Sequence, residues 1–325
     1  MSTTIRVAAI QMESRDGQIE ANLKHAKLLV NDAAARGAKL ILLPEFMPTG
    51  YTYTRAIWDA AEPKDGPTVQ WLLDNSRKLG VWLGTSFLEA EGENFYNTFV
   101  LATPDGKEAG RVRKQTPAAY EAYFFKGDSG PHTISTELGR IGVGICYENQ
   151  LAYIPKLMYE ASVDLVLMPH SAPTPSQSLL FRKQAVDTYN KTLEKIAQRL
   201  AVLLGMPVVM VNKSGIWQTK VPALPVPFLK MDSTFPGLSA IVDSDGKVER
   251  QLGDGEDVIV VDVTLDASRK TRTQPACHGR WAWKGPWLRD YLLLVEACGR
   301  LSYSLSSERR RKARQVSSSN NRQRA

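Results

Sequence analysis

Short apolar runs recur along this chain and alternate with longer segments of helical periodicity. Runs bounded by polar residues in this way are typical of buried strands. They are Ile5–Gln11, Leu40–Leu43, Val81–Leu88, Asn97–Thr103, Ile141–Ile145, Leu165–Met168, Pro207–Asn212, Ser239–Asp243 and Val258–Val263. Between them, residues 20–37 and 68–79 have the spacing of amphipathic helices and meet glycines at their ends. With hairpin turns such as that at 104–106, the pattern predicts an α/β fold. Periodicity alone leaves open two packed sheets or one doubly wound sheet.

One of these strands ends at a cysteine. The apolar run Ile141–Ile145 leads directly to Cys146, and the polar residues Tyr147, Glu148 and Asn149 follow. A thiol at the end of a strand can act as a nucleophile. An isolated free cysteine more often serves as a small buried hydrophobic residue. The interpretation of Cys146 therefore depends on which other groups the fold places beside it.

Two further strands end at charged residues. The run Leu40–Leu43 meets Pro44, which cannot continue a central ladder, and then Glu45, a carboxylate that can accept and return protons. Residues 107–114 form a return strand that ends at Lys114. An ammonium group there can lower the pKa of a nearby thiol or stabilise an oxyanion. Each of these residues, taken alone, is also typical of a solvated surface charge.

The three strand ends carry motifs that occur in a known order. The motifs are Leu42-Leu-Pro-Glu-Phe46, then Arg113-Lys-Gln-Thr-Pro117 with Glu121 beyond it, and Gly144-Ile-Cys-Tyr-Glu148. The chain thereby resembles the nitrilase superfamily, the carbon-nitrogen hydrolases. Supporting matches lie at residues 7–11, 96–107 and 235–246, so the resemblance covers about residues 5–265. It implies a four-layer α-β-β-α sandwich and a homodimer or larger homo-oligomer.

The resemblance also implies roles for individual residues. Glu45, Lys114 and Cys146 match the Glu-Lys-Cys triad of general base, oxyanion-stabilising cation and nucleophile, and Glu121 matches a second glutamate that positions the substrate or the lysine. We further expect Tyr147 and His170 to line the substrate pocket, although a lone histidine is equally compatible with a structural role. No cofactor or metal is expected, because the four histidines show no metal-ligand spacing.

The net charge of +7 arises mostly in the C-terminal tail. Residues 306–325 contain seven Lys and Arg and one Glu, so six of the seven net positive charges lie there. The remaining chain therefore gives no charge argument for nucleic-acid binding, and a nucleic-acid partner is not expected. A terminal segment rich in Ser, Asn and Arg is typical of disorder. The predicted organisation is a hydrolase domain at 1–265, a Trp-rich extension at 266–305 and a disordered basic tail at 306–325.

Compartment and substrate follow from weaker signals. Three cysteines, no signal-peptide core and no apolar run long enough to span a bilayer predict a cytoplasmic protein without a disulfide framework. The expected reaction is hydrolysis of a small amide, with a nitrile as the alternative substrate. Tyr147 stands where nitrilases usually have tryptophan, which favours the amide. An acyltransferase and a non-catalytic interaction protein with a basic tail remain further alternatives.

Overall fold

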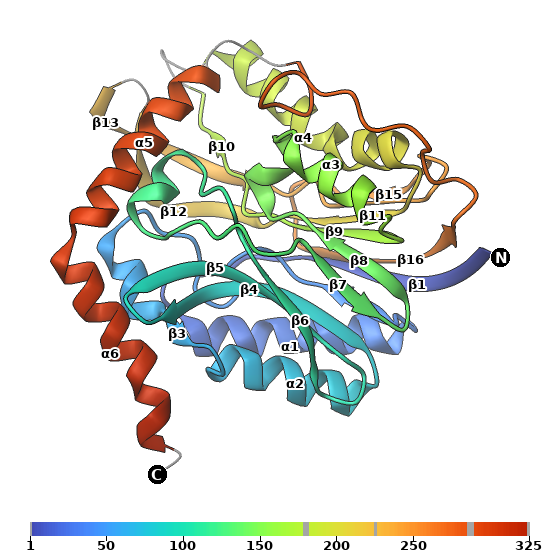
Figure 1. Cartoon of the computed structure of the whole chain (residues 1–325), viewed down its shortest axis with the longest axis horizontal. Coiled ribbons are helices and arrows are strands. Elements are labelled where there is room, and N and C mark those ends of the chain that lie inside the picture. Colours follow the sequence, from blue (N-terminus) through green and yellow to red (C-terminus); the bar gives the residue numbers. More distant parts are fainter. Residues whose placement is uncertain (1, 178–181, 224–225, 285–288, 324–325) are drawn as a thin grey trace.

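The computed structural model describes residues 2–177, 182–223, 226–284 and 289–323 (Figure 1). Within these ranges, one mixed sheet has seven strands. Its order is β16 (Asp257–Asp266), β1 (Ser2–Gln11), β2 (Leu40–Leu42), β4 (Trp82–Glu91), β5 (Asn94–Ala102) and β6 (Glu108–Arg113), with the short β3 (Glu62–Pro63) beside β4. Strands β1, β2 and β4 are parallel, whereas β5 and β6 follow as antiparallel hairpin partners.

A second sheet faces the first. Its strand order is β15 (Val248–Gln251), β14 (Ala240–Val242), β11 (Val208–Val211), β9 (Leu165–Pro169), β8 (Gly139–Val143) and β7 (Thr133–Thr136). The three central strands β8, β9 and β11 are parallel. A small third sheet joins β10 (Thr174–Pro175), β13 (Val226–Pro236) and β12 (Ser214–Ala223). The β12–β13 hairpin is absent from the elements that the sequence predicts.

The two main sheets form the inner layers of a sandwich. Helices α1 (Ile19–Ala35) and α2 (Pro67–Leu79) cover the outer face of the first sheet, and α3 (Tyr153–Glu160) and α4 (Lys183–Leu204) cover that of the second (Figure 1). Strand β1 is apolar on both faces, as a strand between two layers must be. Its Val7 and Ala9 pack toward the second sheet, whereas Ala8 and Ile10 pack toward α1 and α2. The predicted α-β-β-α sandwich is confirmed, and the doubly wound alternative is excluded.

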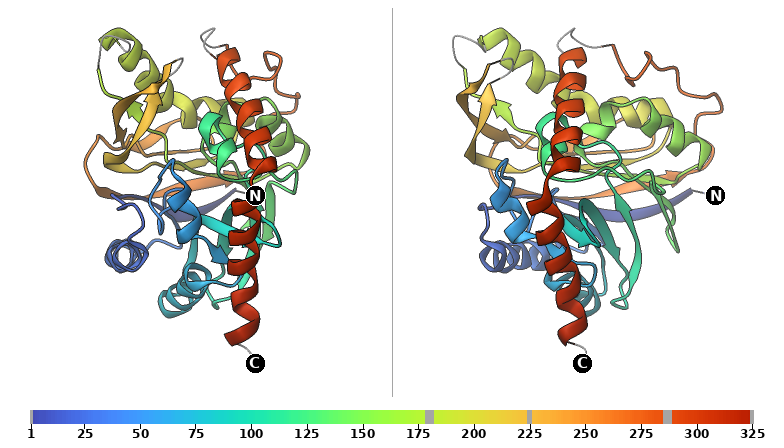
Figure 2. Two further views of the ribbon diagram at one scale, coloured as in Figure 1. Left: turned by 90° about the vertical axis from the view of Figure 1, so that its left-hand side faces the viewer. Right: turned by 60° about the vertical axis from the view of Figure 1, so that its left-hand side comes forward.

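The C-terminal region differs from the prediction. Helix α5 (Arg289–Leu305) and helix α6 (Ser307–Gln323) follow one another along one side of the sandwich (Figure 2). The expected disordered tail is therefore helical as far as Gln323. Its Ala313 is fully buried in an aromatic cluster, and Lys312 and Arg314 form ion pairs with Asp59 and Glu93. These distant partners order a segment whose own composition favours disorder.

The Trp-rich extension lies against the sandwich rather than apart from it. Trp281 forms isolated strand bridges with Leu151 and His278, and Trp283 packs against the main core. Trp287 lies outside the described residues. No helix in the described part of the chain is long and apolar enough to cross a membrane.

Candidate active site

The predicted site residues converge at one edge of the sandwich. Glu45 follows β2 and Lys114 follows β6 in the first sheet, whereas Cys146 follows β8 in the second. Strand β6 runs in the same direction as β2, because two antiparallel pairings separate it from β4. The carboxyl ends of these strands therefore share an edge, as in other sheets with parallel strands. Glu121 reaches the same place from the 3-10 helix η2 (Ala119–Tyr123).

Glu45 is fully buried and held from both sheets. Its Oε1 accepts hydrogen bonds from Asn97 Nδ2 at 2.7 Å and Lys114 Nζ at 2.8 Å. Its Oε2 accepts the backbone N–H of Ser171 at 2.8 Å, and the Ser171 hydroxyl donates to the Glu45 carbonyl at 2.6 Å. The following Phe46 has a φ of +49°, a left-handed conformation that non-glycine residues rarely adopt. The carboxylate is thus fixed in one orientation.

Lys114 lies between two carboxylates. Its Nζ is 2.8 Å from Glu45 Oε1 and 2.8 Å from Glu121 Oε2, and all three side chains are fully buried. Burial alone lowers the pKa of Lys114, but the carboxylates of Glu121 and Glu45 outweigh that effect, and the pKa lies well above its ordinary value. The ammonium therefore stays charged inside the protein.

Glu121 has further partners besides the lysine. The backbone N–H of Ala118 donates to its Oε2 at 2.5 Å, and the Tyr51 hydroxyl donates to its Oε1. Burial, reinforced by repulsion from Glu45, raises the pKa of Glu121 even though Lys114 opposes this. Glu121 thus gives the Lys114 ammonium a second carboxylate partner besides Glu45.

Cys146 occupies a strained bend at the start of the 3-10 helix η3 (Cys146–Gln150). Its φ is +53°, again in the left-handed region. Two residues earlier, a Cβ at Gly144 would lie 2.0 Å from Asn149 Oδ1, so only glycine fits there. Asn149 Nδ2 in turn donates to the carbonyls of Gly144 at 2.7 Å and Cys146 at 3.1 Å. This bend holds the thiol where the strand ends.

The thiol of Cys146 is protonated at rest. Burial raises its pKa well above the ordinary value, and the carboxylates of Glu45 and Glu121 raise it further. Lys114 and the backbone N–H of Ser171 oppose this rise but do not overcome it. The sequence predicts that Lys114 lowers this pKa; the lysine does act in that direction, yet burial dominates. A nucleophilic thiol here needs a base that removes its proton.

Glu148 ties the Cys146 bend to the Lys114 loop. Its Oε1 accepts the backbone N–H groups of Gln115 at 2.6 Å and Thr116 at 3.2 Å, while Oε2 accepts that of Ile145 at 3.2 Å. Burial alone would raise its pKa, but hydrogen bonds from His132 and Tyr153 bring it below the ordinary value. Sequence reasoning did not assign this glutamate a role, although its motif contains it.

The two residues that the sequence predicts in the substrate pocket, His170 and Tyr147, have different surroundings. His170 is buried at the end of β9, with its Nε2 3.1 Å from Asn149 Nδ2, and burial lowers its pKa to about 3. It is therefore a neutral side chain behind the Cys146 bend. Tyr147 is also buried, and its hydroxyl donates to Glu296 of α5 at 3.0 Å. Its side chain is thus engaged with the C-terminal helix.

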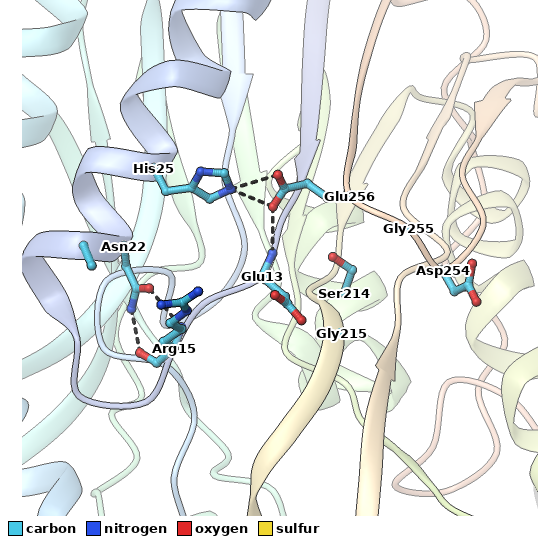
Figure 3. A pocket seen from close by; sticks show the side chains of 10 residues that line it. Glu13, Arg15, Asn22, His25, Ser214, Gly215, Asp254, Gly255 and Glu256 are labelled. Carbon is cyan, nitrogen blue, oxygen red and sulfur yellow. Dashed lines mark hydrogen bonds and ion pairs between the residues drawn. The ribbon is translucent and has the colours of Figure 1, made fainter.

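A cavity lined by Glu13, His25 and Glu256, among others, does not include these residues. It has a volume of about 630 Å³ and opens between α1 and the loop before β16, where His25 pairs with Glu256 (Figure 3). Ser214, at the start of β12, also lines it. Neither Glu45 nor Cys146 lines this cavity. Among the described residues, no cluster of three or more His, Cys, Asp or Glu side chains could hold a metal ion.

A second buried lysine, which the sequence analysis does not single out, contacts the residue after Glu45 at the same edge of the sandwich. Lys213, two residues after β11, donates to the Phe46 carbonyl at 2.9 Å. Burial lowers its pKa to about 7, although Asp16 and Glu45 act in the opposite direction. Asn97 and Ser171 were missed as well. None of these residues has a local signature, because each acquires its role only through a partner that is distant in the sequence.

Comparisons with known proteins find similar sequences. A family model described as carbon-nitrogen hydrolase matches residues 6–273. N-carbamoylputrescine amidase of Solanum lycopersicum is 27% identical over 281 residues, which cover 82% of this chain and 89% of that protein. Nitrilase 1 of Arabidopsis thaliana is 29% identical over 188 residues, or 52% of this chain. The match spans only 54% of that nitrilase.

Solved structures show the same fold. A carbon-nitrogen hydrolase from Helicobacter pylori G27 superposes with a TM-score of 0.71 at 21% identity, covering 82% of this chain and 91% of its own. A mutant of the Nesterenkonia AN1 amidase superposes with a TM-score of 0.65 at 20% identity, covering 82% and 92%. Both alignments support the sandwich that the strand order gives.

Proposed function

Since this chain belongs to the carbon-nitrogen hydrolase family, we propose that it hydrolyses a small amide to a carboxylate and ammonia through a cysteine thioester. The observation that carries the proposal is the buried Lys114, held at 2.8 Å from both Glu45 and Glu121 beside a protonated Cys146. These are a base, a cation and a nucleophile in one buried site, which together suit acyl transfer.

The first half of the reaction forms the thioester. Glu45 removes the proton of the Cys146 thiol, and the sulfur attacks the amide carbonyl carbon. The carbonyl oxygen takes the negative charge, which Lys114 and the backbone N–H of Tyr147 stabilise. When the carbon–nitrogen bond breaks, protonated Glu45 returns its proton to the nitrogen, so ammonia leaves as a neutral molecule.

The second half restores the enzyme. Glu45, again ionised, removes a proton from water, and the oxygen attacks the thioester carbonyl. The carbon–sulfur bond breaks, Cys146 regains a proton through Glu45, and the carboxylic acid leaves. Glu121 fixes Lys114 throughout, because its Oε2 lies 2.8 Å from the Lys114 ammonium. No cofactor takes part in these steps.

The extent of similarity favours an amide over a nitrile. The N-carbamoylputrescine amidases match this chain over most of their own length, whereas the match to nitrilase 1 covers about half of that protein. A mutant of the Nesterenkonia amidase, a protein of similar fold, carries the acetamide moiety of fluoroacetamide on its active-site cysteine, which supports a cysteine nucleophile in such an amidase. Nitrile hydrolysis is the second candidate, since nitrilases reach 29% identity over the matched segment.

The test is ammonia release from paired amides and nitriles of equal acyl length, with N-carbamoyl amines included. Wild type should release ammonia from an amide, and Cys146→Ala should abolish this release. Cys298→Ala is the matched control, because that cysteine is exposed on α5 and should leave activity unchanged. Faster ammonia release from nitriles than from amides would show that the protein is a nitrilase rather than an amidase. Activity that survives in Cys146→Ala would refute the mechanism.

Association of copies and cellular location stay predictions. The expected homodimer is supported by Leu294, Leu301 and Leu305, which form a row on α5 and are 60%, 62% and 71% exposed. Light scattering with Leu301→Glu tests this, since a charge in the row should dissociate the assembly. The cytoplasmic location expected from the sequence needs fractionation of cells that express the chain.

A further inference from the structure

We propose that Glu296 on helix α5 is a positioning residue of the active site, acting on the Cys146 bend through the hydroxyl of Tyr147. The inference rests on the proposed thiol chemistry but adds a part of the chain that the family match does not include, because that match ends at residue 273. Three sets of contacts between the C-terminal region and the candidate site carry it.

The first set holds the side chain next to the nucleophile. Glu296 is fully buried and accepts the Tyr147 hydroxyl on Oε1 at 3.0 Å and the Arg280 guanidinium on Oε2 at 2.7 Å. The Tyr147 ring also meets the Trp281 ring edge-on, with centroids 6.1 Å apart. Since a buried carboxylate is costly unless it is paired and hydrogen-bonded, these partners fix one arrangement.

The second set holds the backbone after the nucleophile. Residues Arg280–Ala282 run beside the end of η3: the Ala152 N–H donates to the Arg280 carbonyl at 2.8 Å, and the Ala282 N–H donates to the Gln150 carbonyl at 2.9 Å. Contacts with Glu296 and Trp281 thereby hold the side chain of Tyr147. Hydrogen bonds to the 280–282 segment hold the other end of the 3-10 turn that begins at Cys146. A turn strained at φ +53° requires such support from its surroundings.

The third set concerns Glu121. Helix α5 packs directly on η2, the segment that carries Glu121. A Cβ at Gly299 of α5 would lie 2.8 Å from the side chains of Ala122 and Tyr123, so the helix approaches as closely as a glycine allows. One helix therefore touches both the residue after Cys146 and the residue after Glu121. Glu296 lies at the point where α5 is tied to the nucleophile bend.

The experiment measures two reactions on the full chain. One is turnover of the amide found in the ammonia assay. The other is alkylation of Cys146 by iodoacetamide, followed by mass spectrometry of the peptide that contains it. The variants are Glu296→Ala, Glu296→Gln, Tyr147→Phe and the double variant Tyr147→Phe with Glu296→Ala. Ser302→Ala, at an exposed position of the same helix, is the control.

We expect Glu296→Ala to lower kcat by roughly tenfold with little change in KM, because a displaced nucleophile affects the chemical step more than binding. The alkylation rate of Cys146 should change by at least about threefold, while that of the exposed Cys298 stays the same. Glu296→Gln keeps an acceptor for the tyrosine hydroxyl and should lose less. The double variant should lose no more activity than the more damaging of the two single variants, because both substitutions remove the same contact.

Several results would overturn the inference. Unchanged kcat and unchanged Cys146 alkylation in folded Glu296→Ala would leave the residue a merely structural role, and so would effects of Glu296 and Tyr147 that simply add. If Glu296→Ala does not fold, the same two measurements on Tyr147→Phe test the inference, because that substitution removes only the hydroxyl that contacts Glu296. If wild type hydrolyses no amide but Cys146 alkylation still responds to Glu296, the proposed function fails while this inference stands.

Discussion

Two buried lysines at the same edge of the sandwich have opposite surroundings. Lys114 and Lys213 are both fully buried. Lys114 lies between the carboxylates of Glu45 and Glu121 and has a pKa well above its ordinary value. Lys213 donates to a backbone carbonyl instead, and burial lowers its pKa from 10.5 to about 7. Burial is common to both, so the partners decide which lysine keeps its charge.

This difference separates two kinds of work. A permanently charged ammonium can stabilise an oxyanion, and Lys114 is positioned to do so. An amine that loses its proton near neutral pH is suited to hold a carbonyl without bringing a charge into the core. Lys213 does this for Phe46, whose carbonyl follows the strained turn after Glu45. In the proposed mechanism, Lys114 therefore serves charge stabilisation, whereas Lys213 supports the geometry of Glu45.

The largest effect should come from Lys114→Met. The substitution leaves two buried carboxylates facing each other without a cation, which should lower the free energy of unfolding by about 3–5 kcal/mol. Loss of the oxyanion partner should also reduce turnover by at least about 100-fold. Urea denaturation and the ammonia assay measure both. A variant as stable as wild type would show that the carboxylates do not depend on Lys114.

Removing one carboxylate should make Lys114 more similar to Lys213. In Glu121→Gln the raising effect of one partner disappears, so the pKa of Lys114 should fall. The alkaline limb of the pH–rate profile should then move to lower pH, and kcat should decrease by roughly 10–100-fold. An alkaline limb that does not move would show that Lys114 does not control it.

The contrast also explains what the sequence could predict. Glu45 and Cys146 each follow an apolar strand, and Lys114 directly follows the return strand of a hairpin whose turn at 104–106 is visible in the local sequence. The same holds for most strands of the two main sheets. Lys213 and Glu296 were missed because their partners, Phe46 and Tyr147, lie more than a hundred residues away. The basic tail was assigned by composition, whereas Ala313 of this segment is buried in an aromatic cluster whose other members are distant in the sequence.

Lys213→Met should have a smaller effect that depends on pH. Below about pH 7 the amine is protonated in both folded and unfolded chains, so stability does not depend on its titration. Between about pH 7 and 10.5 the unfolded chain binds one more proton than the folded chain, and raising the pH therefore stabilises the folded wild type.

The variant lacks this contribution. The stability of wild type relative to Lys213→Met should therefore rise with pH above 7, by at most about 1.4 kcal/mol per pH unit. Loss of the hydrogen bond to Phe46 should add about 1–3 kcal/mol at every pH. Urea denaturation at pH 6.5 and about pH 9 measures both. Lys107→Met, at an exposed position, is the control. The difference in unfolding free energy between wild type and this variant should not change with pH.

The smallest effect should come from a lysine that is neither buried nor needed for the site. Lys312 on α6 pairs with Asp59 at 2.5 Å, but the two side chains are 26% and 66% exposed. Water screens such a pair, so Lys312→Ala should cost only about 0.5 kcal/mol, less at high salt, and leave turnover unchanged. A loss as large as that of Lys213→Met would mean that α6 is held by this contact rather than by the burial of Ala313. Urea denaturation at low and high salt distinguishes the two, because only an ion-pair contribution fades as salt increases.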